Sequence, residues 1–492
     1  MSDPARNPLR PAFSRRQMLK LMGGAVGMAA LAACAAPGGG PAPAGNTGSN
    51  TGAITSTTNV SGTTGSAAPA KVGGKLTVVH RREYFKEMET IFEDAVKKWG
   101  TANNVEVEVS AVASEAFEDF VAKLVAQVQA GEPPDLVYHV RLVQQLYSLD
   151  ALEPVTDVVE KTEALYGKAP AGQRYANFID KQWYGIPYIM SGGGAYGRRD
   201  VFKAAGIDVD KDMATYEQRR DACLKVSDSA KPMYGWGVTV NKSGDGTGFI
   251  EGVIQNWGGH YTDEGMTKIT FNSPETIAAV KWMAEIYTSD KYKPMLPPGI
   301  ISWTDSSNNE AYLAGNIAYT HNAASVYAKA KKDGNPVFKN TVYFETATGP
   351  LGKKLEAGGG GQFNIPKGAK NPDAAKALAM YMIQPDVFLP ISLISAGLFL
   401  PAYQNYYTMP EVVKAFAEDQ NLERMGKAAL GDFVGSSWPA PPSPFFDAIA
   451  AQTVLTDMMA QIITKGAKPE DAVKQAADRI QKIADEQGAL KK

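Results

Sequence analysis

The chain has 492 residues, with 50 basic and 52 acidic side chains and a formal net charge of −2. This length exceeds a single ordinary hydrophobic core, so two or more lobes are expected. The near-neutral charge gives no electrostatic basis for binding nucleic acid or an anionic membrane surface. The content of 44% hydrophobic and 21% charged residues is typical of a soluble globular body.

The first 34 residues have the pattern of a bacterial export signal. Residues 14–20 contain paired arginines, and the apolar run 21–33 is too short for a stable transmembrane helix. The arginine pair resembles a twin-arginine signal, and residues 31–34 resemble a lipobox ending at Cys34. This resemblance implies that Cys34 is the first mature residue and carries a lipid anchor. Met18 stands where the twin-arginine pattern has phenylalanine, so the general export route remains the alternative.

The cysteines and the segment after the signal fit a tethered protein. Cys34 and Cys223 are the only cysteines, so acylation of Cys34 would exclude an intrachain disulfide. We expect Cys223 to be a small buried residue within a helix. Residues 35–71 are almost entirely glycine, alanine, proline, serine, threonine and asparagine, which predicts a disordered tether.

The globular body begins with alternating strands and helices. Hydrophobic periodicity predicts strands at 75–80, 105–112 and 135–139, with helices at 85–99 and 116–129 between them. This alternation predicts a parallel α/β sheet with helices on both faces. Ligands of such sheets bind near the ends of strands. The candidate rim residues are Arg81, Arg82, Glu83, Tyr84, Asp135, His139 and Arg141.

A hinge is predicted in the middle of the chain. The strand-like stretch 183–188 contains Pro187 and is followed by the glycines 192–194, which can absorb large dihedral changes. Three aromatic rings, those of Trp183, Tyr184 and Tyr188, are candidates for a ligand cleft beside the hinge. The alternative interpretation is a core strand that ends in a turn.

The alternation resumes after this hinge. Ser273, Pro274 and Glu275 have the pattern of a helix start. The other predicted elements are helices at 216–227, 249–257 and 371–383, strands at 234–240, 315–321, 341–344 and 362–365, a glycine loop at 241–248, and a mostly helical tail from 410 to 486.

The patterns of common enzyme sites are missing from the sequence. The four histidines are scattered without metal-ligand spacing, and residues 208–219 fail as a calcium loop because Met213 and Arg219 occupy its glycine and glutamate positions. Neither a phosphate loop nor a nucleophile elbow is present. We therefore expect no metal, no cofactor and no catalysis, with glycoside cleavage by a carboxylate pair as the remaining enzyme alternative.

Five short motifs occur in one order along the body: residues 184–187, 272–275, 311–319, 361–375 and 397–401. Together they resemble the extracellular solute-binding protein family 1 of ABC importers, which includes the maltose-binding type. The resemblance covers essentially all of residues 75–492 and implies an α/β, two-lobe periplasmic-binding-protein-like fold of type II with three interlobe crossings. The implied first lobe comprises 72–187 and 341–385, and the second comprises 188–340 and 386–492.

The resemblance implies a receptor that closes around a sugar or oligosaccharide and passes it to a permease with a separate ATPase. The implied location is the outer face of the cytoplasmic membrane, and the implied state is a monomer. Family positions suggest ligand contacts from both lobes. These residues are Arg81, Glu83, Tyr84, His139, Arg141, Tyr188, Trp236, Asp245, Phe249, Trp257, Trp303, Asp305, Asn322 and Trp438.

Tyr188, Trp257, Trp303 and Trp438 are the first candidates for stacking on sugar rings. Residues 323–325 lack the aromatic of maltose-type proteins, which argues against maltodextrin. An anionic solute held by Arg81, Arg82, His139 and Arg141 is the alternative ligand class; a polyamine or peptide is also open. A secreted carbohydrate-active enzyme is the alternative from another class of protein.

Overall fold

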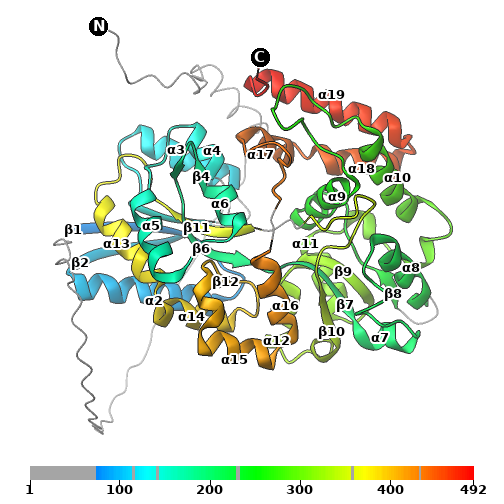
Figure 1. Cartoon of the computed structure of the whole chain (residues 1–492), viewed down its shortest axis with the longest axis horizontal. Coiled ribbons are helices and arrows are strands. Elements are labelled where there is room, and N and C mark those ends of the chain that lie inside the picture. The colour runs from blue at the N-terminus through cyan, green and yellow to red at the C-terminus, as the bar shows by residue number, and fades with distance from the viewer. Residues whose placement is uncertain are drawn as a thin grey trace, which may run out of the picture. The chain divides into compact units, whose positions relative to one another are not determined.

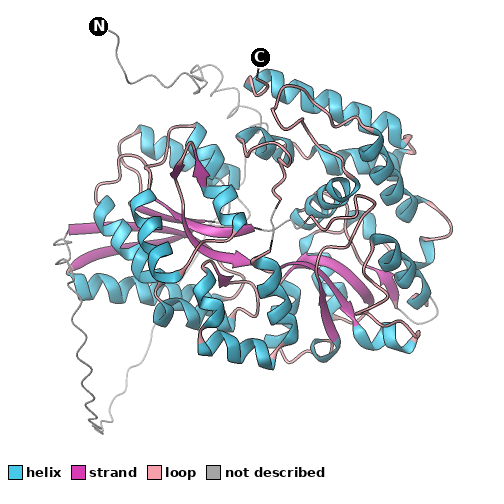
Figure 2. Cartoon of the chain, viewed as in Figure 1, coloured by secondary structure: helices cyan, strands magenta, loops and turns pink. Residues whose placement is uncertain are grey.

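The computed structural model describes residues 74–112, 117–139, 143–228, 233–355, 359–431 and 434–491. The expected export signal with Cys34, the expected tether and Arg141 lie outside these ranges. Residues 73–492 form one unit by the clustering of their contacts. Within the described ranges, this unit contains two main β-sheets, and each sheet organises one lobe (Figure 2).

The first lobe is built on a six-stranded sheet with the strand order β12-β6-β11-β3-β1-β2. Only β1, β2 and β3 pair in parallel, whereas β11 and β12 run antiparallel to their neighbours. The predicted parallel sheet is therefore a mixed sheet. Its strands are β1 (Gly74–Arg81), β2 (Val105–Val112), β3 (Leu136–His139), β6 (Ile186–Ser191), β11 (Gly359–Asn364) and β12 (Leu400–Pro401).

Helices cover both faces of this sheet (Figure 1). Helix α2 (Lys86–Asn103) buries Met88, Phe92, Val96 and Trp99, whose helical spacing is the hydrophobic periodicity that predicted a helix at 85–99. Asn104 ends this helix in the left-handed region, with φ of 53°, which asparagine tolerates better than most residues. The other helices of this lobe are α3 (Phe117–Gln129), α4 (Val143–Ser148), α5 (Thr156–Tyr166), α6 (Ala171–Asn177), α13 (Pro372–Ile383) and α14 (Pro385–Ile394), with the hairpin β4 (Phe178–Ile179) and β5 (Gln182–Trp183).

The second lobe is built on a four-stranded sheet with the order β10-β7-β9-β8. Its core is rich in aromatic rings, and Cys223 is fully buried within it, as predicted. Its strands are β7 (Gly193–Arg198), β8 (Tyr234–Trp236), β9 (Ile317–Ala323) and β10 (Thr341–Phe344). Its helices are α7 (Arg199–Ala204), α8 (Tyr216–Val226), α9 (Gly244–Trp257), α10 (Pro274–Thr288), α11 (Asp305–Leu313), α12 (Ser325–Lys332), α17 (Pro444–Ala451), α18 (Val454–Lys465) and α19 (Pro469–Gln487).

Short 3-10 helices and two further α-helices complete the described fold. Helix α16 packs on β10 of the second sheet, whereas α15 contacts α14 of the first lobe. These elements are η2 (Lys293–Met295), η3 (Ile300–Ser302), η4 (Phe338–Asn340), η5 (Gln404–Thr408), α15 (Pro410–Glu418) and α16 (Gln420–Ala429). Within the described ranges, no single helix has the length and hydropathy needed to cross a membrane; the bent pair α13 and α14 meets those criteria together.

The chain moves from the first sheet to the second through Gly192, which separates β6 from β7. It returns between β10 and β11, and it leaves again after β12. Two expected lobe boundaries differ from this arrangement. Strand β10 pairs with β7 in the second sheet, although residues 341–344 were expected in the first lobe. Helix α14 packs on α2 of the first lobe, although residues from 386 onward were expected in the second. Both differences arise because strand pairing and helix packing depend on distant partners.

Helix termini largely follow their sequence signals. The Ser273 side chain accepts a hydrogen bond from the Thr276 N–H and starts α10, as predicted. Helix α9 begins at Gly244, earlier than the predicted start at Phe249. The Ser243 hydroxyl accepts from the Gly246 N–H, and a carboxylate from another helix accepts from the first two N–H groups of α9. This long-range cap draws the glycine loop into the helix.

Candidate ligand-binding site

The ends of several first-lobe strands meet at one edge of the six-stranded sheet. His80 of β1 lies beside Tyr138 of β3, and His139 lies beside Gln362 of β11. Gly359, the first residue of β11, pairs with Ser191, the last residue of β6. The candidate rim residues after β1 and β3 therefore share the edge at which the chain leaves for the second lobe.

The second sheet presents the end of β9 at the same crossing. Gly193 pairs with Ala323, and Gly194 pairs with Asn322. Since Gly193 follows Gly192 directly, the end of β9 lies next to the passage between the lobes. Both sheets thus bring strand ends to the crossing, where ligands of α/β proteins commonly bind.

A network of carboxylates and amides surrounds the end of β9. The Asp305 carboxylate, on α11, accepts from the backbone N–H groups of Gly244 at 3.1 Å and Asp245 at 2.9 Å. The Asn308 amide donates to Asp245 Oδ2 at 2.9 Å and to the His321 carbonyl at 3.3 Å. The Asn322 amide donates to Asn309 Oδ1 at 2.7 Å. Three elements, α9, α11 and β9, are therefore joined through polar side chains, of which Asp245, Asp305 and Asn322 were expected to bind ligand.

Asp245 has the most perturbed carboxyl group of this network. Burial and the neighbouring Asp305 carboxylate raise the pKa of Asp245 to about 7, although the Asn308 amide and the Ala323 N–H act in the opposite direction. Within the described ranges, the hydrogen bonds to these two carboxylates come from backbone N–H groups and from the Asn308 amide, and none comes from a basic side chain. The site consequently offers hydrogen-bond acceptors without a compensating cation, which suits a ligand that carries donors.

Trp303 is the predicted stacking residue that this region leaves accessible. Trp303 packs against the aromatic core of the second lobe and against a neighbouring buried cluster that contains Tyr312, and it is only partly buried. Its carbonyl accepts from the Thr239 hydroxyl at 2.9 Å, which fixes the backbone just before α11. A partly exposed indole close in sequence to Asp305 and Asn308 can supply an apolar face beside polar groups.

The rim after β1 is dominated by an internal ion pair. Arg81 donates to both oxygens of Glu83, at 3.0 and 2.9 Å. Burial raises the pKa of Glu83, although the Arg81 guanidinium opposes the shift. Arg81 also lies 6.0 Å from the ring centroids of Tyr138 and Phe399. Its donors are therefore largely engaged, whereas Tyr84 beside it is 48% exposed.

Four aromatic candidates and His139 lie in hydrophobic cores instead of at a rim. Tyr188 is 2% exposed and packs 4.5 Å from Phe363. His139 stacks on Phe120 at 5.0 Å. In the second lobe, Trp236, Phe249 and Trp257 are each buried among other rings. All five side chains are buried, so their burial does not favour their interpretation as ligand contacts.

Trp438 lies away from the carboxylate network. Its ring meets His260 edge-on at 4.6 Å, in a loop between α16 and α17. The Trp438–Pro439 peptide bond is cis. The ring remains partly exposed, so Trp438 stays a candidate stacking residue on a different part of the second lobe.

Asn308 and Asn309 were not among the sequence candidates. Both belong to residues 305–309, a polar run at the start of α11 that follows Trp303. Asn308 is completely buried, and a buried amide must find hydrogen-bond partners. The sequence signal for these two residues was an aromatic residue followed closely by consecutive asparagines in the first turns of a helix.

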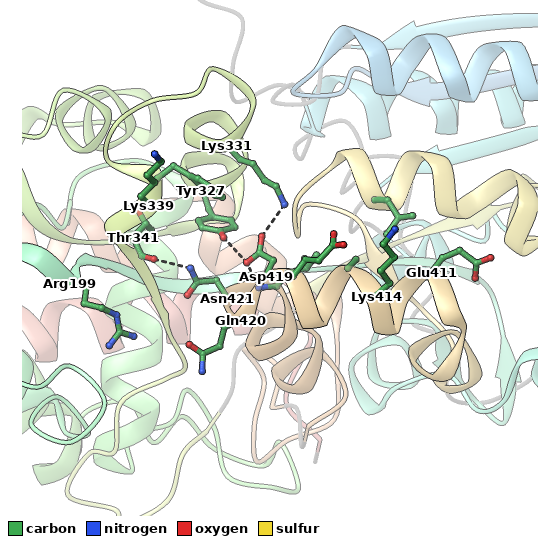
Figure 3. Close-up of a pocket in the computed structure, with 15 residues that line it drawn as sticks. Arg199, Tyr327, Lys331, Lys339, Thr341, Glu411, Lys414, Asp419, Gln420 and Asn421 are labelled. Atoms are coloured by element: carbon green, nitrogen blue, oxygen red, sulfur yellow. Dashed lines mark hydrogen bonds and ion pairs between the residues drawn. The ribbon is translucent and has the colours of Figure 1, made fainter.

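A recess with a volume of about 770 Å³ lies elsewhere in the described part of the chain (Figure 3). It is bordered by α12, η4, α14, α15 and α16. Asp419 accepts from the Tyr327 hydroxyl at 2.7 Å, from Lys331 at 2.9 Å and from the Leu422 N–H at 3.1 Å. The buried acid of this recess is thus occupied in capping α16, and none of the predicted site residues lines the recess.

Within the described ranges, no group of three or more His, Cys, Asp or Glu side chains is placed so that it could bind a metal ion. Asp245 and Asp305 are the only carboxylates of the network described above, and amides surround them. The arrangement can hydrogen-bond a polar molecule.

Residues 94–422 match the family described as bacterial extracellular solute-binding protein. The chain belongs to this family. The matched region begins within α2 and ends within α16, so it includes every described strand of the two sheets except β1. The family of this solute-binding protein agrees with the resemblance that its five sequence motifs suggested.

Solved structures agree with the two-lobe fold of this solute-binding protein. A solute-binding protein of Thermotoga lettingae bound to α-D-tagatose is similar at 20% identity with a TM-score of 0.68, covering 83% of this chain and 99% of that one. Maltose-bound MalE3 of T. maritima is similar at 19% identity with a TM-score of 0.69, covering 83% and 100%. The predicted α/β two-lobe fold is confirmed.

A probable ABC transporter-binding protein of Deinococcus radiodurans is 24% identical over 212 residues, which is 42% of this chain. The chain spans about half, 48%, of the length of that relative. The family and the similar structures are solute-binding receptors, in agreement with the expectation of a protein that is not an enzyme.

Proposed function

We propose that this solute-binding protein is a lipid-anchored receptor that binds a sugar or oligosaccharide between its lobes and delivers it to an ABC importer. The observation that carries the ligand class is the network of Asp245, Asp305, Asn308 and Asn322 beside the partly exposed Trp303. Similar structures hold α-D-tagatose, maltose and laminaribiose. The anchor at Cys34, twin-arginine export, a monomeric state and a permease with its own ATPase belong to the same proposal.

A sugar matches this site through its two kinds of surface. Its hydroxyl groups can donate to the carboxylates and exchange hydrogen bonds with the amides, which keeps each buried polar group paired. Its apolar ring face can stack on an indole such as Trp303. The ligand needs no chemical change; it only has to bind one arrangement of the lobes better than the other.

The anionic alternative is less favoured by the described charges. Arg81 is engaged by Glu83, and His139 is buried against Phe120. The uncompensated carboxylates of Asp245 and Asp305 would repel a phosphate or carboxylate ligand. A cationic solute such as a polyamine remains compatible with those carboxylates, so the test must include one.

A thermal-shift panel tests the ligand class. We expect at least one neutral mono- or oligosaccharide to raise the unfolding midpoint, because a ligand bound only by the folded state stabilises it by about 2.7 kcal/mol at 100 times its Kd. Glycerol phosphate, spermidine and short peptides form the comparison set. Stabilisation by phosphate esters alone would replace the sugar assignment, and recovery of a cleaved oligosaccharide would contradict a receptor.

Replacement of Trp303 by alanine is expected to weaken binding of the panel's best sugar by about tenfold, because a stacking face would be lost. The change should leave the fold intact, since the ring is only partly buried. Isothermal titration calorimetry measures the loss. Ile301→Ala is the matched control: it removes an apolar side chain of the preceding 3-10 helix that is 49% exposed. Equal affinities in both variants would remove Trp303 from the site.

A further inference from the structure

A short segment between α16 and α17 is held by both lobes at once. Residues 434–440 contact Tyr175, which lies on α6 of the first lobe. The same segment contacts Gln255, which lies on α9 of the second lobe. The contacts on each side are polar and at least partly buried, so they differ from the exposed ion pairs of the surface.

On the first-lobe side, α6 is fixed to the six-stranded sheet. The buried Gln173 amide donates to the carbonyls of Ile189 at 2.6 Å and Gly361 at 3.3 Å. The Asn177 amide donates to Gln173 Oε1 at 2.8 Å. Tyr175 lies between these two residues in the helix and must therefore move with β6 and β11.

On the second-lobe side, the segment is fixed to α9. The Gln255 amide, 3% exposed, donates to the Gly435 carbonyl at 2.9 Å. Trp438 packs edge-on against His260, which follows α9. Helix α17 begins shortly after the segment and packs mainly on α18 and α19 of the second lobe, although it also contacts α4 of the first lobe. Residues 434–440 must therefore move with the second lobe.

Tyr175 and Ser437 join these two bodies through a directed chain of hydrogen bonds. The Ser437 hydroxyl donates to the Ala440 carbonyl at 2.8 Å, so it accepts from the Tyr175 hydroxyl. The Ser437 N–H donates back to the Tyr175 oxygen at 3.3 Å. Ser437 is 1% exposed, which shields these bonds from competition with water.

Gly435 packs closely against the ring of Tyr175. A Cβ atom at this position would lie 2.0 Å from both Cε1 and Cζ of Tyr175. Gly435 is not among the glycines with positive φ, so its backbone would accept alanine. The three nearest atoms to such a Cβ all belong to Tyr175, so Gly435→Ala provides a second way to disturb the contact without removing a hydrogen-bonding group.

We propose that Tyr175 and residues 434–440 form an interlobe latch that stabilises the lobe arrangement seen here. Movement of one lobe relative to the other about Gly192 must separate Tyr175 from Ser437, because each is tied to its own sheet. A further interlobe ion pair, Lys332 with Glu87, has both side chains exposed, at 41% and 60%, and is expected to contribute little. The latch does not depend on which solute is bound.

Zero-length carbodiimide crosslinking of the full-length protein, read by mass spectrometry, tests the latch. Lys332 and Glu87 lie 2.6 Å apart across the lobes and report their arrangement. Lys376 and Asp157 lie 3.0 Å apart within the first lobe and serve as the internal reference. In Tyr175→Phe, the equilibrium between lobe arrangements should shift about fivefold away from this one, the factor that one net hydrogen bond supplies. The normalised yield of the interlobe crosslink should fall with it.

Two comparisons separate a latch from general loosening. Gly435→Ala should lower the interlobe yield at least as much as Tyr175→Phe, and the same substitution should have no further effect once Tyr175 is alanine. Tyr147→Phe removes a hydroxyl whose bond to Asp180 stays within the first lobe, and its yield should match that of the unaltered protein. Unchanged interlobe yields in Tyr175→Phe and Gly435→Ala would overturn the latch, as would an equal fall in Tyr147→Phe.

Discussion

Replacement of Tyr188 by alanine is expected to lower the free energy of unfolding by about 3–5 kcal/mol, the usual loss for a large aromatic removed from a core. Tyr188 is 2% exposed, and its ring lies 4.5 Å from Phe363, 5.1 Å from Tyr138 and 5.3 Å from Phe388. The cavity left behind would be enclosed by these rings and by the six-stranded sheet. Guanidinium unfolding measures the change.

Tyr188→Phe is the matched variant and should be neutral or more stable by up to about 1 kcal/mol. The Tyr188 hydroxyl is buried without a hydrogen-bond partner among the described residues, so its removal ends an uncompensated desolvation cost. Both results together would establish Tyr188 as a core residue. If Tyr188→Ala kept its stability and lost ligand binding, the ring would be the stacking platform that its sequence position suggested.

Replacement of Asp245 by asparagine is expected to stabilise the unliganded protein at pH 8 and to change little at pH 4. The pKa of the Asp245 carboxyl is raised to about 7 in the folded protein, against about 3.9 in an unfolded chain. Between these values the folded state binds more protons than the unfolded state, so the contribution of this group to stability falls as the pH rises. The penalty becomes constant only well above pH 7, where the carboxyl is ionised in both states.

The expected gain for Asp245→Asn at pH 8 is about 1–2 kcal/mol, reduced from the full shift because the residue is partly solvated. Guanidinium unfolding of both proteins at pH 4, 6 and 8 measures it. Asp263→Asn is the control. The pKa of Asp263 is lowered by its hydrogen bonds with Thr267, so its contribution is constant from pH 6 to 8. A pH-independent difference for Asp245→Asn would show that its carboxyl titrates normally.

The same carboxyl links pH to ligand binding under the proposed function. A sugar hydroxyl that donates to Asp245 would favour its ionised form, so binding should release a proton below pH 7 and tighten as the pH approaches that value. Asp245→Asn should abolish this pH dependence. The effect would add evidence for direct contact that a stability measurement alone does not supply.

The sequence pattern did not determine which aromatic residues lie in the core and which lie at the rim. Tyr188, Trp236 and Trp257 stand in the same kinds of strand and helix as true rim residues would, and each was a reasonable cleft candidate. Which face of a sheet a ring occupies depends on the register and on the helices that cover that face. Phe363 and Phe388, far along the chain, decide that Tyr188 is enclosed.

The amino-acid sequence by itself determined the family, the two-lobe α/β fold, the apolar stripe of α2 and the start of α10 at Ser273, because these depend on local periodicity, capping and ordered motifs. Only the tertiary structure decided that β10 joins the second sheet, that Asp305 draws Gly244 and Asp245 into α9, and that Asn308 completes the polar network. Those features rest on contacts between residues dozens of positions apart. No local pattern encodes such contacts, since their free energy arises only when the distant partners meet.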